Sequence, residues 1–110
     1  MAARTDRALE SVANRQARRR AFNEQLDRLG GEPLLYRCEC GLIGCDAAIR
    51  MERQDYASLR SDERHFGMLS AHVIPEAERV VERHGAWVTV EKPAGMATLV
   101  TRFDPAAQLR

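Results

Sequence analysis

The sequence lacks the long apolar segments and the paired cysteines that mark membrane and secreted proteins. No run of about 18 apolar residues is present, so we expect no transmembrane helix. The first residues hold no apolar segment of a secretory signal. Three cysteines cannot all pair within one chain, so no disulfide framework of the secreted type is predicted. We therefore expect a reducing, cytoplasmic setting.

Aromatic residues and lysine are also scarce. Only 5% of the residues are aromatic, so the core must rely on Leu, Val, Ile and Ala. At 110 residues the chain has room for one domain, and so small a core would gain from a bound metal or a partner. Lys92 is the single lysine among 17 basic residues, and the formal net charge of +1 does not indicate a nucleic-acid partner.

The cysteines are gathered in one short segment with the spacing CxC-x4-C. Residues two apart in an extended strand point to the same side, so Cys38 and Cys40 can converge on one ion. Gly41 and Gly44 allow the backbone to turn back and bring Cys45 to the same point. A structural zinc site fills all four tetrahedral positions with protein groups, often with cysteine sulfur. The segment therefore predicts a structural zinc site that needs one more ligand.

A histidine is the expected fourth ligand, and the chain offers three. We predict His72, because it follows an expected strand and lies in a loop-like stretch where its side chain can turn inward. His65 begins that strand and could serve in the same way. His84 falls at the tip of an expected hairpin, where side chains usually face solvent. Water is the other alternative, and it would make the site a catalytic one.

Other interpretations of the cysteine segment stay open. Buried free thiols are common in cores, but Glu39 and the two glycines are more typical of a loop. A redox-reactive set would replace bound zinc by a disulfide, and an iron–sulfur cluster normally needs four cysteines. In an open zinc site Glu39 or Asp46 could act as a base, yet no second acid–base group supports an enzyme. We therefore predict no catalytic residue.

The remaining pattern predicts an α+β fold, with a long N-terminal helix packed on a small, mainly antiparallel sheet. Apolar residues recur at three- and four-residue steps over residues 6–29, and Gly30 marks the end of that helix. Short β-branched and apolar runs between turn residues predict strands at 34–38, 65–69, 79–83 and 87–91, and residues 53–61 predict a helix. A helix over residues 76–83 competes with the strand at 79–83, because 76–78 are a fair helix start. Residues 46–51 and 96–103 are each compatible with helix or strand.

We expect these elements to form one domain over residues 1–110. It consists of the helix at 6–29, a zinc-stabilised core at 33–103 and a loose tail at 104–110. The helix carries four arginines near its middle, Arg15, Arg18, Arg19 and Arg20. They are compatible with a solvated basic face or with a surface that binds acidic groups or phosphates. No aromatic residues that could stack on bases are expected beside them, so we predict a protein partner rather than nucleic acid, and no membrane contact.

Several of these segments resemble a family of short uncharacterised proteins from actinobacteria. Its members show an F-x-CEC-x4-C segment, a following E-Y helix, a P-G-H-E loop and a VVE…VVEK ending. The residues that correspond here are 37–45, Ile49, Tyr56, 75–82 and 88–92, and the similarity spans roughly residues 14 to 95. The family's loop histidine falls on His72, although Ala71 and Val73 replace the glycine before it and the glutamate after it. The resemblance implies a bacterial, cytoplasmic protein and carries no activity with it.

Together the residues predict a small cytoplasmic protein with a structural Cys3His zinc site that acts as a macromolecule-binding or regulatory module. The first alternative is a thiol sensor of oxidants or metal supply, in which disulfide formation releases the zinc. A nucleic-acid-binding protein and an open-site zinc hydrolase are the further alternatives.

Overall fold

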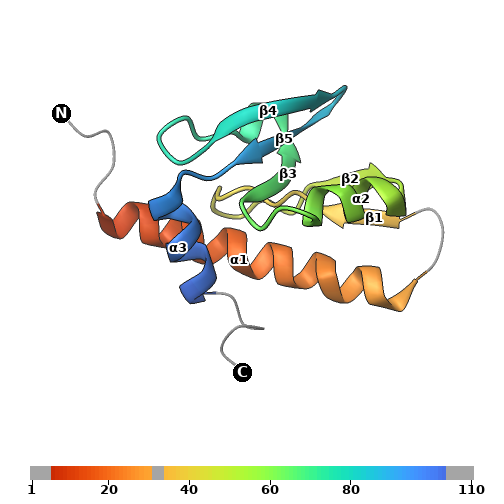
Figure 1. The fold of residues 1–110 in the computed structure, drawn as a ribbon, viewed down its shortest axis with the longest axis horizontal. Coiled ribbons are helices and arrows are strands. Elements are labelled where there is room, and N and C mark those ends of the chain that lie inside the picture. Colours follow the sequence, from red (N-terminus) through yellow and green to blue (C-terminus); the bar gives the residue numbers. More distant parts are fainter. Residues whose placement is uncertain (1–5, 31–33, 104–110) are drawn as a thin grey trace.

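The computed structural model describes residues 6–30 and 34–103. Its longest element is the helix α1 (Asp6–Leu29), and the strands lie along one side of this helix (Figure 1). Gly30 follows the helix with a φ of 77°, a left-handed conformation that glycine adopts without steric cost. The helix predicted at residues 6–29 is thus confirmed. The loose tail predicted at 104–110 lies outside the described residues.

Two antiparallel sheets face α1 in Figure 1. The smaller sheet pairs β1 (Leu34–Arg37) with β2 (Ala48–Met51). The larger has the order β3-β5-β4 and consists of β3 (His65–Leu69), β4 (Arg79–His84) and β5 (Trp87–Glu91). The helices α2 (Arg53–Arg60) and α3 (Ala94–Phe103) and the 3-10 turn η1 (Ser70–His72) complete the described elements. The predicted α+β class is confirmed, with the strands divided between two sheets instead of one.

Two segments that the sequence left undecided are assigned by the structure. The one after the cysteines becomes the strand β2, because it pairs with β1 over its whole length. The C-terminal segment becomes the helix α3, which buries Met96 and Val100 and packs against α1. The expectation that His84 faces solvent is wrong. Its ring is half-buried and stacks on Trp87 with 3.9 Å between the ring centroids, which shields both rings from water.

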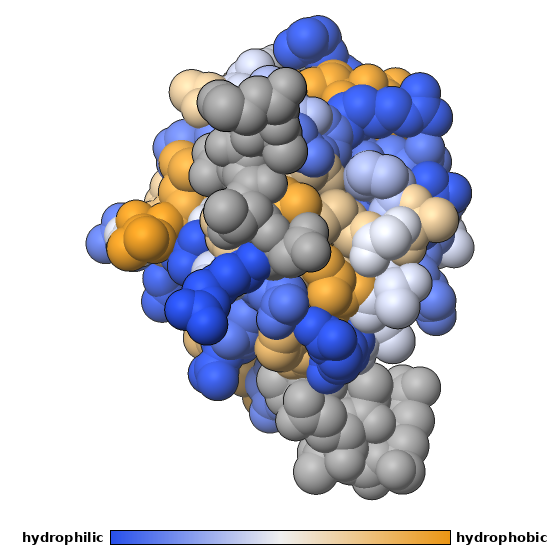
Figure 2. All heavy atoms as spheres, turned by 90° about the vertical axis from the view of Figure 1, so that its left-hand side faces the viewer, coloured by the Kyte–Doolittle hydropathy of each residue, from blue (hydrophilic) through white to orange (hydrophobic). Residues whose placement is uncertain are grey.

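The core lies between α1, the two sheets and α2. Tyr36 of β1 and Tyr56 of α2 stack with their ring centroids 4.3 Å apart, which joins the smaller sheet to that helix. The larger sheet and α1 contribute further buried side chains, among them Val12, Ala13, Ala17, Phe66, Met68, Val88 and Val90. None of the described helices combines the length and the apolar composition that crossing a bilayer requires. At the end of the molecule where α1 begins, apolar residues stand in small groups among hydrophilic ones (Figure 2).

A buried ion pair joins the segment before β4 to the end of β5. The side chains of Glu78 and Lys92 are both fully buried, and the Lys92 ammonium donates to Glu78 Oε1. The same oxygen accepts a hydrogen bond from Gln16 of α1 at 2.9 Å, and Oε2 accepts one from the backbone N–H of Ile74 at 2.7 Å. Burial lowers the pKa of Lys92, and the neighbouring Glu78 carboxylate opposes that change. The pair therefore ties α1 to the larger sheet.

We expect Lys92→Met to destabilise the protein by about 3–5 kcal/mol, because it leaves the buried Glu78 carboxylate without its cation. The double variant Glu78→Gln with Lys92→Met removes both charges, so it should recover part of that loss. Urea unfolding of the single and double variants measures both effects. A single variant as stable as the parent would show that Glu78 finds another partner or takes up a proton.

Candidate metal centre

The cysteine segment bridges the two sheets. The backbone N–H of Cys38 donates to the carbonyl of Ala47 at 3.0 Å, which extends the pairing of β1 and β2 by one step. The next N–H, that of Glu39, donates to the carbonyl of Gly67 in β3 at 2.8 Å. Because β3 is an edge strand, this bond joins the smaller sheet to the larger one. Main-chain bonds of Cys38 and Glu39 therefore attach the start of the cysteine segment to both sheets.

A tight turn brings the third cysteine back. The N–H of Cys45 lies 3.5 Å from the carbonyl oxygen of Leu42, and Gly44 has a φ of 74° at the third position of the turn. A turn of this kind needs a positive φ there, which favours glycine. The sequence prediction that Gly44 reverses the chain is confirmed. Gly41, which was given the same task, has no positive φ.

The structure brings the three cysteines together with His72. Their four ligand atoms, the sulfurs of Cys38, Cys40 and Cys45 and a ring nitrogen of His72, all lie within 4.8 Å of one another. His72 Nδ1 is 3.4 Å from Cys38 Sγ and 3.6 Å from Cys45 Sγ. The 3-10 turn after β3 places the histidine there. Of the three histidines weighed as fourth ligand, His72 is the one that the structure places beside the cysteines.

These distances fit a tetrahedral metal ion. Zinc–sulfur bonds of about 2.3 Å and zinc–nitrogen bonds of about 2.0 Å, at the tetrahedral angle, separate a sulfur from a nitrogen by roughly 3.5 Å. Both measured sulfur–nitrogen distances lie within 0.1 Å of that value. Cys38 and Cys40 are buried, whereas Cys45 and His72 are half-buried, so the cluster is shielded on one side and reachable from the other. The Cys3His cluster can therefore hold a metal ion.

Hydrogen bonds favour the thiolate form of one of the sulfurs, that of Cys40. The Cys38 thiol donates to the sulfur of Cys40, and this bond lowers the pKa of Cys40 to about 5. The same bond, together with burial, raises the pKa of Cys38 above its usual range. The backbone N–H of Leu69 donates to Cys38 Sγ at 3.2 Å, and the guanidinium of Arg19 lies 3.6 Å from Cys40 Sγ. Such donors stabilise thiolates, which are the form that binds metals.

Glu39, between the first two cysteines, is fully buried and does not belong to the cluster. Its Oε2 accepts hydrogen bonds from Asn23 of α1 at 2.9 Å and from the Tyr56 hydroxyl of α2 at 3.2 Å. Its Oε1 accepts one from the Gly67 N–H at 3.1 Å and lies 3.7 Å from the guanidinium of Arg60. Both oxygens are thus occupied, so Glu39 is not available as the base that an open zinc site would need.

Helix α1 also holds the cysteine segment. Arg15 Nε donates to the carbonyl of Gly41 at 2.6 Å, and Arg19 donates to the carbonyl of Cys40 at 2.5 Å. The backbone at Gly41 approaches α1 so closely that a Cβ there would lie 2.4 Å from Val12 Cγ1 and 3.3 Å from Val12 Cα. Glycine is therefore needed at position 41 for close packing and not for its backbone angles.

We expect Gly41→Ala to destabilise the protein by about 1–3 kcal/mol, because the new methyl group forces the segment away from α1. Metal affinity should fall with it, since Cys40 moves together with Gly41. Gly95→Ala is the matched control: a Cβ at Gly95 meets nothing within 4 Å, and alanine favours the helix α3. Thermal unfolding of the two variants makes the comparison. Equal unfolding midpoints for the two variants would show that α1 moves to accommodate the methyl group without a loss of stability.

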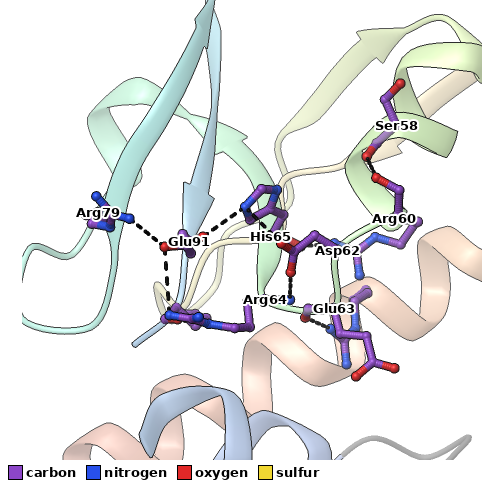
Figure 3. Close-up of polar contacts among 11 residues, drawn as sticks. Ser58, Arg60, Asp62, Glu63, Arg64, His65, Arg79 and Glu91 are labelled. Carbon is purple, nitrogen blue, oxygen red and sulfur yellow. Dashed lines mark hydrogen bonds and ion pairs between the residues drawn. The ribbon is translucent and has the colours of Figure 1, made fainter. Parts of the chain in front are cut away.

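The two other histidines have different roles. His84 Nε2 lies 2.8 Å from the hydroxyl of Thr89. His65 lies between Glu91 and Asp62 (Figure 3). Its Nε2 is 3.2 Å from Glu91 and 3.5 Å from Asp62. Glu91 also binds Arg79 at 2.7 Å, and the hydrogen bonds from Arg79 and then His65 lower the pKa of Glu91. This second cluster is an ion-pair network on the larger sheet, and the arginine beside it disfavours a metal cation.

One of the four arginines named from the sequence is not on the surface. Arg20 is buried, its guanidinium lies 4.8 Å from the centre of the Phe66 ring, and it donates to the carbonyl of Glu63. Arg15, Arg18 and Arg19 instead border a surface hollow together with Phe22 and Arg37. The expectation that no aromatic ring lies beside these arginines is therefore wrong for Phe22.

Searches of the sequence against protein-family models and curated proteins, and of the structure against solved structures, found no match.

Proposed function

We propose that this chain is a small cytoplasmic binding module whose fold is held by a structural zinc ion on Cys38, Cys40, Cys45 and His72. The observation that supports the proposal best is the pair of sulfur–nitrogen distances, 3.4 and 3.6 Å, which suit a tetrahedral zinc ion. Sulfur ligands favour zinc over hard cations such as magnesium and calcium. Free thiols that bind zinc also fit a reducing compartment.

A structural role suits the site better than a catalytic one. Four protein ligands would leave no position for a water molecule, which catalytic zinc sites keep open. The one carboxylate inside the cysteine segment, Glu39, is occupied by hydrogen bonds from two helices and β3. Zinc would therefore join the segment after β1 to the turn after β3, and the function would lie on another surface.

We place that surface on α1, with a protein as partner. Arg18 is exposed, and Arg15 and Arg19 are half-buried beside it. The ring of Phe22, 49% exposed, lies among them. Arginine and aromatic residues, phenylalanine included, are enriched at protein interfaces relative to the rest of the surface.

Metal analysis of the purified protein tests the zinc site. We expect about one zinc per chain in the parent protein, and strongly reduced zinc in Cys38→Ser and His72→Ala. His65→Ala and His84→Ala are matched controls, because both histidines lie in other clusters, and they should keep their zinc. Full zinc occupancy in both Cys38→Ser and His72→Ala would refute the ligand assignment.

One observation favours a thiol sensor as the second candidate. Cys45 is half-buried and follows the exposed turn residues Ile43 and Gly44, so an oxidant can reach its sulfur. The other two sulfurs lie within 4.8 Å, near enough for a disulfide after a small movement. A sensor would release zinc and lose two thiols on mild peroxide treatment. A static structural site would keep its zinc and all its thiols. A thiol titration before and after treatment counts the thiols, and metal analysis measures the zinc.

A further inference from the structure

A hollow of about 250 Å³ lies beside the metal centre, and four arginines line it. The lining consists of Arg15, Arg18, Arg19 and Arg37 together with Phe22. Three of the arginines come from α1 and the fourth from β1, so the hollow lies where the helix meets the smaller sheet. Guanidinium groups stay charged at all physiological pH values. The hollow therefore concentrates positive charge without an acidic residue in its wall.

The contacts of Arg18 and Arg37 leave the charges of these two side chains uncompensated. Arg18 donates to the side-chain oxygen of Asn14 at 3.1 Å, and Arg19 to the carbonyl of Cys40. Arg37 lies over the ring of Phe22, with its guanidinium carbon 5.0 Å from the ring centre. Within residues 6–30 and 34–103, neither Arg18, Arg19 nor Arg37 forms an ion pair with a carboxylate. The partners of Arg18 and Arg37 are neutral, whereas Arg19 also lies 3.6 Å from the sulfur of Cys40. Each guanidinium keeps further N–H donors for a ligand.

The chemistry of the hollow suits a phosphate group. Arginine binds phosphate and carboxylate through paired N–H donors. A phosphate monoester carries a charge of about −2 and three acceptor oxygens, so it can engage several guanidinium groups at one point. A single carboxylate offers two oxygens and half that charge. Several arginines around one small hollow therefore favour the phosphate.

A second hollow, of about 410 Å³, continues from the first and shares Phe22 and Arg37 with it. Its wall is mostly apolar, with Leu26, Leu35 and Ala47 among the lining residues, and it also includes the acidic Asp46. Leu35 is 55% exposed, so this groove is open to solvent. Small-molecule sites usually enclose most of their ligand. An open apolar groove that leads into a cationic hollow instead suits a chain segment with an apolar side chain next to its phosphate.

We propose that this surface binds a phosphorylated segment of the partner protein. The phosphate lies between Arg18, Arg19 and Arg37, and a neighbouring apolar side chain lies on Phe22 and Leu35. The inference rests on the proposed function, because it names the chemistry of the partner at the same face of α1. It also connects the surface to the metal centre: Arg15 and Arg19 hold the carbonyls of Gly41 and Cys40, so the zinc-bound segment positions the guanidinium groups.

Fluorescence anisotropy with the zinc-loaded full chain tests this. The probes are labelled phosphoserine peptides with leucine beside the phosphoserine, and the same peptides without phosphate. We expect binding only of the phosphorylated form, weakening as salt is added. Arg18→Gln and Arg37→Gln should each weaken it roughly tenfold or more, the usual effect of losing a charged hydrogen bond. Arg83→Gln, which removes an exposed arginine of β4, is the matched control and should change affinity by less than about twofold.

Competition separates the other possible ligands. Phenyl phosphate and inorganic phosphate should displace the peptide only at much higher concentration, because they lack the chain that fills the groove. Equal potency of free phosphate would overturn the inference in favour of a small phosphate ligand, and tighter binding of a single-stranded oligonucleotide would overturn it in favour of nucleic acid. If the parent protein holds zinc but binds no phosphorylated peptide, the inferred phosphopeptide site is overturned, whereas the zinc site stands. Loss of zinc from the parent would instead count against the proposed function.

Discussion

Removal of zinc is expected to unfold most of this protein at temperatures where the zinc-bound form is stable. Structural zinc contributes on the order of 10 kcal/mol to the folding of small zinc domains. Natural domains have a net stability of only about 5–15 kcal/mol, so the loss of such a term consumes most of it. The four candidate ligands come from the segment after β1 and from the turn after β3, so a bound ion would close a loop between the two sheets.

Circular dichroism during thermal unfolding measures this effect, with and without a strong zinc chelator. The unfolding midpoint should fall steeply with the chelator and return when zinc is restored. Cys40→Ser provides the internal control: it should unfold at a low temperature in either condition, since it lacks a ligand already. A parent protein that unfolds at the same temperature with and without chelator would refute a structural metal. Cys38 and Cys40 would then be buried thiols in an independently stable core.

The features that the sequence predicted well are local ones. The spacing of Cys38, Cys40 and Cys45 within one segment indicated a common site, and the repeat of apolar residues indicated the helix now seen as α1. A histidine in a loop can turn inward, which favours His72 as the fourth ligand, and the structure places His72 beside the cysteines. Each of these predictions needed only a few neighbouring residues. The metal itself stays a prediction until it is measured.

The polar interior could not be predicted in the same way. Gln16 and Glu78 are 62 positions apart in the sequence, and nothing in either neighbourhood indicates that they meet. Charged residues are normally assigned to the surface, because burial of a charge is costly unless a partner is present. The sequence pattern placed Arg20 on a basic face of the helix, although its side chain is buried, and it gave no sign that Lys92 is buried as well. Whether such a charged residue is buried therefore depends on partners that are distant in the chain.

Glu39 shows how the polar interior and the metal centre are connected. In an extended segment the side chains of Cys38 and Cys40 point to one side and that of Glu39 to the other. The two cysteines enter the metal cluster, while the Glu39 carboxylate enters the space between α1, α2 and β3. The position of the Glu39 carboxylate and the positions of the two sulfurs thus depend on each other, because a shift of Glu39 would move both sulfurs. Burial and the nearby Glu39 charge also raise the pKa of Tyr56, so its hydroxyl stays a donor to the carboxylate.

We therefore expect Glu39→Ala to destabilise the protein by about 3–5 kcal/mol, because it leaves the buried donors of Asn23, Tyr56 and Gly67 without an acceptor. Zinc affinity should fall as well, although no zinc ligand has been changed. Tyr56→Phe removes a single hydrogen bond and should cost only about 1 kcal/mol.

Glu52→Ala is the matched control for this prediction. Glu52 is exposed at the start of α2 and makes no side-chain capping bond, so its loss should change stability by less than about 0.5 kcal/mol. Urea unfolding gives the stabilities, and competition with a chromogenic chelator gives the zinc affinities. If Glu39→Ala lost stability but bound zinc as tightly as the parent, the carboxylate would support only the core. A loss of both stability and zinc affinity would show that Glu39 positions the flanking cysteines. The reason is that a Glu39 side chain buried between two helices and a strand leaves the segment only one orientation.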